Sequence, residues 1–138
     1  MYIKNNETED VILQNLFYIL GNSTGGTGDI RITVLRNPTS GTIVDGATNV
    51  SINQNRNFGS NKTLDVTAYK GAEGNTFTNG DAAIDTILGS DAQRVPLSIG
   101  GVVLQKGSSF GVELTPQTSN TSMDIMIAVE AYRVTVQV

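Results

Sequence analysis

The amino-acid sequence predicts an all-β protein, a single-domain antiparallel β-sandwich of jelly-roll or Greek-key type with about 8–10 strands. Apolar and polar residues alternate strictly in several segments, a pattern typical of strands that bury one face. Gly, Ser, Thr and Asn make up more than a third of the 138 residues, which favours turns and Thr-rich strand faces over long helices. Long connections, at 53–61 and 70–82, favour a Greek-key or jelly-roll arrangement over a simple meander.

The alternation is clearest in the last third of the chain. Apolar residues occupy every second position in 110–114 and again in 123–129. A polar connection that contains Pro116 separates the two runs. Two alternating runs around such a loop predict a hairpin.

The start of the chain is less clear. Tyr2, Ile3 and Lys4 are expected to form a short edge strand. The segment 11–20 fits either a helix or a strand, because it is apolar in both periods. The helical face would hold Leu13, Leu16, Phe17 and Leu20, whereas a strand would place Leu13, Phe17 and Ile19 on one face. Since the rest of the chain is β, we predict a central strand, and a lone helix is the alternative.

The middle of the chain contains further strands. The segment 29–36 is expected to form a strand with Ile30, Ile32 and Val34 inward, followed by a break at 37–38. Asp45-Gly46 suits a type I′ turn, so 41–44 and 47–52 are predicted to form a tight hairpin. The other expected strands are 64–69, with Leu64, Val66 and Ala68 on one face, and 82–88, 95–99 and 102–104.

Composition limits the classes of function. The net charge is −4 and the nine basic residues are scattered, so a nucleic-acid partner is not expected. No run of apolar residues is long enough to span a membrane as a helix. We expect one domain over residues 1–138, with no visible secretory signal peptide and, without Cys, no disulfides.

The residue types of common catalytic sites are missing. Without His or Cys, the chain has no imidazole base, no thiolate nucleophile and no Cys- or His-ligated zinc site. The carboxylates Glu73, Asp81, Asp85 and Asp91 have no spacing that indicates a glycosidase pair or a calcium loop, and we interpret them as solvated turn residues. We therefore expect no enzymatic activity, no cofactor and no metal.

Two segments are candidate contact sites. Arg56, Asn57 and Phe58 place an aromatic ring in a polar loop, where it either fills a pocket of a partner or caps the sandwich. In the final segment the apolar residues change from odd to even positions near Ala131. A β-bulge explains this change, and so does a strand over 132–138 that joins a neighbouring subunit. The candidate contact residues of that segment are Tyr132, Val134, Val136 and Val138.

Short segments along nearly the whole chain resemble a group of small virion proteins of tailed bacteriophages, especially marine ones. These segments are 2–5, 36–44, 55–60, 69–74, 104–109 and 120–123. The resemblance implies a jelly-roll-like protein that decorates or stabilises the capsid, forms a homotrimer and contacts the major capsid protein. It supplies no catalytic residues.

The favoured hypothesis is therefore a non-enzymatic virion structural protein. It would be made in the host cytoplasm and bound to the capsid surface as a trimer. The alternative is a receptor- or glycan-binding module of a tail fibre or baseplate, because a jelly roll does not decide between these roles. A small polysaccharide-degrading enzyme that uses Asp and Glu is the least favoured hypothesis.

Overall fold

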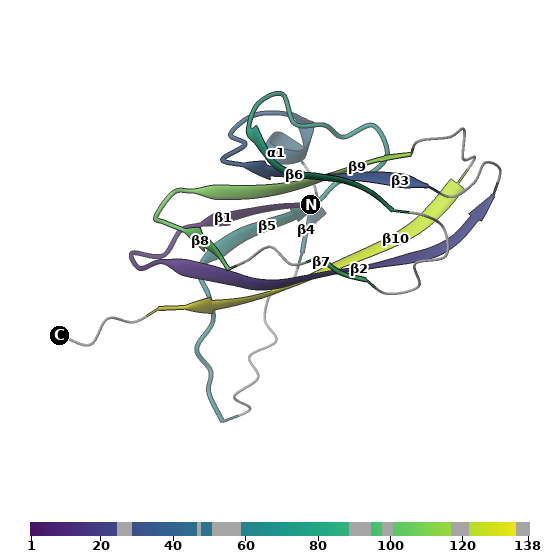
Figure 1. Cartoon of the computed structure of the whole chain (residues 1–138). Coiled ribbons are helices and arrows are strands. Elements are labelled where there is room, and N and C mark those ends of the chain that lie inside the picture. Colours follow the sequence, from purple (N-terminus) through teal and green to yellow (C-terminus); the bar gives the residue numbers. More distant parts are fainter. Residues whose placement is uncertain are drawn as a thin grey trace.

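A computed structural model describes residues 1–24, 29–46, 48–50, 59–88, 95–97, 101–116 and 122–134. Two antiparallel sheets pack face to face in it (Figure 1), which confirms the predicted single-domain β-sandwich. The elements in chain order are β1 (Tyr2–Asn5), β2 (Val11–Thr24), β3 (Ile30–Arg36), α1 (Thr42–Gly46), β4 (Thr48–Asn49), β5 (Val66–Lys70), β6 (Asp81–Leu88), β7 (Val95–Leu97), β8 (Val102–Leu104), β9 (Ser109–Pro116) and β10 (Ser122–Arg133).

The two sheets differ in width. The wide sheet has six strands in the order β4-β5-β1-β9-β3-β6. The narrow sheet has β10 at one edge and β2 in the middle. Strands β7 and β8 both pair with β2 on its other side, at Leu16–Tyr18 and at Val11–Leu13 respectively, so they lie end to end. The narrow sheet is therefore only three strands across.

Pairing is mostly between strands that are distant in sequence. Among the described strands, β4 and β5 alone are both successive and paired. The chain crosses from one sheet to the other between β1 and β2, β2 and β3, β6 and β7, β8 and β9, and β9 and β10. This connectivity is of the Greek-key kind and not a meander.

The predicted hairpin over 110–129 is wrong. Strand β9 lies in the wide sheet between β1 and β3, whereas β10 lies in the narrow sheet beside β2. The connection between them crosses the sandwich. Alternation shows that each strand has one buried face, but it carries no information about which sheet a strand joins.

The predicted edge strand at the start of the chain is also wrong. Strand β1 is central, with β5 on one side and β9 on the other. The Met1 amine donates a hydrogen bond to the Val112 carbonyl at 2.8 Å, and the Val112 amide donates one to the Met1 carbonyl at 2.8 Å. The first residue is thereby held beside β9 at the centre of the wide sheet.

The segment around Asp45-Gly46 forms the short helix α1 and not a hairpin. Ile43 in this helix is only 3% exposed, so the packing of its side chain against the rest of the protein stabilises the helix. Gly41, at φ 125°, precedes the helix, and a Cβ there would lie 2.3 Å from the Thr76 carbonyl oxygen. This close approach of two backbones outweighs the local preference of Asp-Gly for a tight turn.

A second small apolar cluster lies on the outer face of the wide sheet. Helix α1 and the segment 71–80 lie over this face (Figure 1). Tyr2 stacks on Tyr69 with ring centroids 5.9 Å apart, and the Phe77 centroid lies 6.3 Å from Tyr2. Tyr2 is 3% exposed as a result, and the chain covers this face of the wide sheet itself.

The main core lies between the sheets and follows the predicted alternation in most strands. In β3, Ile30, Ile32 and Val34 are buried and Arg31 is exposed, as predicted. Strand β2 confirms a strand over 11–20, and the strand continues to Thr24. The core cluster consists of Ile3, Val11, Leu13, Leu16, Tyr18, Ile30, Ile32, Val34, Leu104, Phe110 and Val112.

Candidate interaction surface

An extra residue in β2 determines which side chains of the narrow sheet face outward. Leu13 pairs with Ala131 and Asn15 pairs with Glu130, which leaves Gln14 without an opposite residue in β10. The buried positions of β2 accordingly change from odd (Val11, Leu13) to even (Leu16, Tyr18). The predicted faces of this strand are therefore wrong: Leu13 faces the core, whereas Phe17 follows the outward phase of Asn15.

The predicted register irregularity near Ala131 is present, but the inserted residue is Gln14 of β2. Strand β10 keeps one phase, with Ile125, Ile127, Val129 and Ala131 packed against the core. Tyr132 pairs with Ile12 of the same chain, and the Val134 amide donates to the Asp10 carbonyl at 3.0 Å. Tyr132 and Val134 are thus apolar residues on the outer face of the narrow sheet. The change from odd to even apolar positions is explained within one chain and requires no neighbouring subunit.

The outer face of the narrow sheet carries several exposed apolar side chains, which we call the apolar face. Across β10, β2 and β8, Tyr132, Ile12 and Val103 lie in one row. The exposed fraction is 48% for Tyr132, 50% for Val103 and 37% for Val134. Met126, further along β10, is 56% exposed.

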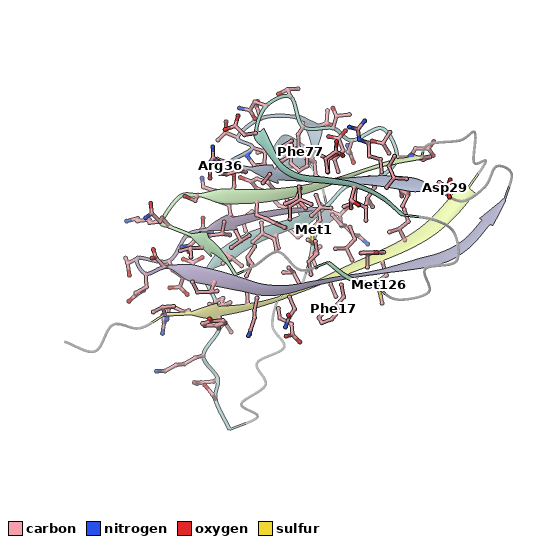
Figure 2. All side chains as sticks on the ribbon, in the orientation of Figure 1. Met1, Phe17, Asp29, Arg36, Phe77 and Met126 are labelled. Carbon is pink, nitrogen blue, oxygen red and sulfur yellow. The ribbon has the colours of Figure 1, made fainter. Side chains whose placement is uncertain are left out.

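One polar pair interrupts the apolar face. Between the Tyr132 row and Phe17, the Asn15 amide donates to Glu130 Oε2 at 2.8 Å. Phe17 then lies opposite Ala128 of β10. Figure 2 labels Phe17 and Met126 beside the narrow sheet and Phe77 over the wide sheet. On the outer face of the wide sheet, Tyr69 and Phe77 cover Tyr2.

Sequence reasoning found part of this surface. Tyr132 and Val134 were predicted contact residues, and the structure places them together at the end of β10. Met126 and Val103 were missed, although both stand in segments that are apolar at odd and even positions alike. Arg56, Asn57, Phe58, Val136 and Val138 lie outside the described residues, so their contacts stay predictions.

Two of the carboxylates considered as catalytic or calcium-binding groups, Asp81 and Asp85, lie in strand β6 and not in a turn, and both pair with arginines. Asp85 accepts hydrogen bonds from both Nε and an Nη of Arg31, and the hydrogen bond from Arg31 holds the pKa of Asp85 below its usual value. Asp81 lies 3.1 Å from Arg36. Asp91 lies outside the described residues, and within the described ones no three His, Cys, Asp or Glu residues group as a metal site.

A cavity of about 300 Å³ opens between β3 and β6 of the wide sheet and β8 of the narrow sheet. Two polar residues of its lining are bonded within the chain: Ser109 Oγ donates to the Pro38 carbonyl at 2.6 Å, and Asn37 Oδ1 accepts from the Ser109 amide. The Tyr18 hydroxyl is buried without a hydrogen-bond partner, and burial raises its pKa, but Tyr18 is not part of this lining. Ser109 Oγ and Asn37 Oδ1 are thus occupied within the chain and are not the convergent polar groups of a small-molecule site.

Comparison with known proteins leaves the chain without a family. No protein-family model, curated protein or solved structure matches it. In the described part of the chain no helix has the length and apolar character needed to cross a membrane. The surface with the most distinctive chemistry is the apolar face of the narrow sheet.

Proposed function

We propose that this chain is a non-enzymatic structural protein of a bacteriophage virion. In this proposal it binds the outside of the head as a homotrimer and reinforces contacts between major capsid subunits. The protein is made in the host cytoplasm and ends on the capsid surface. No cofactor, metal, nucleic acid or membrane is part of the proposal.

The observation that carries the proposal is the apolar face. A protein that reinforces a shell needs an extended complementary area and not a deep pocket. Large apolar side chains that stay exposed together mark interaction sites on soluble proteins. Tyr132, Val103 and Met126, each about half exposed, supply such a surface on a sandwich whose core residues are almost fully buried.

The polar chemistry of the described residues agrees with a binding role. Arg31 and Arg36 neutralise Asp85 and Asp81 on the wide sheet. In the cavity beside β8, Ser109 Oγ and Asn37 Oδ1 are bonded within the chain. The resemblance to phage head proteins is what specifies the capsid as the partner, and the segments 56–58 and 132–138 remain its predicted contact sites.

Binding to phage heads that lack this protein tests the proposal. Purified protein should co-sediment with such heads, saturate them, and have in solution the mass of a trimer or of a multiple of three subunits. Tyr132→Asp should weaken head binding by about tenfold or more, because it places a charge in an apolar contact. Ile87→Asp is the matched control, since Ile87 is 58% exposed but lies on β6 of the wide sheet.

Two results would overturn the proposal. Protein that stays monomeric and does not sediment with heads is not a decoration protein. Saturable binding to a host polysaccharide, with no binding to heads, would instead establish the receptor-binding alternative.

A further inference from the structure

Strand β10 ends the narrow sheet with a long free edge. It has 12 residues, pairs with β2 on one side, and has no described strand on the other. Natural edge strands usually block further pairing with Lys, Pro, a bulge or a short length. From Ile125 to Ala131, β10 contains neither Lys nor Pro, and the inserted residue of the bulge belongs to β2. Its edge is therefore shaped to accept another strand.

The incomplete burial of the inward side chains of β10 also indicates that another strand can pair with its edge. Its inward side chains Ile125, Ile127 and Val129 are only partly buried, whereas Leu13 and Leu16 of β2 are at most 1% exposed. The wide sheet has six strands and the narrow sheet three across, a difference of about 14 Å at the usual spacing between strands. A further strand beside β10 would bury more of these three side chains.

The direction of the backbone groups can be assigned. The Val134 amide donates to the Asp10 carbonyl, so it points toward β2. Amide and carbonyl groups of alternate residues in a regular strand point to the same side. The even-numbered residues of β10 therefore bond to β2, and the odd-numbered residues from Ile125 to Arg133 direct their groups to the free edge.

We propose that two copies of this chain pair through their β10 edges, antiparallel and about a two-fold axis, with Val129 opposite the second copy's Val129. Odd-numbered residues then form the hydrogen-bonded pairs. Even-numbered residues form the non-hydrogen-bonded pairs, in which Cα atoms lie about 4.5 Å apart. Met126 lies opposite the second copy's Tyr132, and Ala128 lies opposite its Glu130.

The side chains select this register. In this register Met126 of each copy lies opposite Tyr132 of the other copy. These are large apolar side chains of the described part of β10, 56% and 48% exposed. A centre at Ala128 would set Met126 against a carboxylate, and a centre at Glu130 would set two carboxylates opposite one another, which is destabilising. A centre at Ile127 would set Tyr132 against Ser122.

The proposed pairing of β10 edges is a different contact from the one that forms the proposed trimer. A two-fold contact does not close a ring of three subunits, so it joins subunits of different rings. Its test must therefore report the β10 contact itself and not the oligomer mass, and it needs no phage heads.

Disulfide trapping provides that test, because the chain has no cysteine of its own. Met126→Cys and Tyr132→Cys proteins are purified separately, mixed and mildly oxidised. The mixture should give a cross-linked dimer about tenfold more abundant than either protein alone, since only unlike copies bring the two sulfurs within disulfide range. A mixture of Tyr132→Cys with Ile87→Cys, whose cysteine lies at an exposed position of β6, is the control.

Single proline substitutions in β10 test the backbone hydrogen bonds between the two copies. Ala131→Pro removes an amide from the free edge, whereas Ala128→Pro removes one that bonds to β2. Ala131→Pro in the Met126→Cys protein should lower cross-linking to Tyr132→Cys by about tenfold while circular dichroism stays that of a sheet. Cross-linking of the mixture no greater than that of the Ile87→Cys control would overturn the proposal, as would cross-linking that Ala131→Pro leaves unchanged in a folded protein.

Discussion

The amine of Met1 should make stability depend on pH. It is largely buried beside β9, where it donates to the Val112 carbonyl. Burial lowers the pKa of this amine from 8.0 to about 6, against a smaller opposing effect of Glu113. The folded protein therefore favours the neutral amine, and between pH 6 and 8 the unfolded chain binds more protons. The free energy of unfolding should rise with pH across this window.

The size of the effect follows from the shift. Two pKa units correspond to about 2–3 kcal/mol, at about 1.4 kcal/mol per unit. The stabilisation is complete above pH 8 and is lost as the pH falls through 6. No His or Cys is present, so no side chain of ordinary pKa titrates in this window. The pH dependence there reports Met1 alone.

Urea unfolding between pH 5.5 and 8.5, followed by circular dichroism, measures this dependence in protein whose chain starts with a free amine at Met1. The unfolding midpoint should rise with pH and level off above 8. A short Gly-Ser extension is the control, because it turns the buried amine into an amide and moves the charge into water. A midpoint that does not change between pH 6 and 8, or one that rises equally in the extended protein, would refute the reasoning.

Three substitutions test other parts of the fold by thermal or urea unfolding. Ile32→Ala should destabilise the protein by about 2–5 kcal/mol, because Ile32 is 1% exposed in the core; a loss below about 1 kcal/mol would contradict its packing. Gly111→Ala should destabilise by about 1–3 kcal/mol, since a Cβ there would lie 2.8 Å from Phe77 Cζ, and unchanged stability would contradict the close cover of β9. Asp85→Asn should leave the midpoint nearly unchanged, because the Arg31 pair is solvent-exposed, and a large loss would assign the pair a structural role.

The sequence predicted strands well where one face is polar. In β3 the polar residues Arg31 and Thr33 mark the alternation, and the strand forms as expected. In β5 Thr67 does so, but the strand begins at Val66, two residues later than expected. The partners of each strand could not be predicted, because alternation is the same in either sheet. The central place of β1 and the crossing between β9 and β10 depend on contacts between residues far apart in the chain, such as Met1 with Val112.

The bulge in the narrow sheet is a second feature that the sequence alone could not locate. The sequence suggests a shift in β10 near Ala131, but the inserted residue is Gln14 in β2. The change in β2 is hidden because Ile12 and Phe17 are apolar on its outward face. Where both faces of a strand are apolar, period-two alternation disappears and the position of a bulge cannot be identified.

A strand that is apolar on both faces needs cover on both. Strand β1 meets this need within the chain, because Tyr69 and Phe77 cover Tyr2 on the outer face of the wide sheet. Strand β10 has the same two-sided character, yet Met126 and Tyr132 remain about half exposed. Pairing of two β10 edges would cover the flanks of these side chains and leave their outward ends free. Those ends are the part that a capsid would contact, so the two proposed contacts use different surfaces of the same residues. Cross-linking between Met126→Cys and Tyr132→Cys should therefore occur both in solution and on phage heads, which separates the pairing of copies from the attachment to a shell.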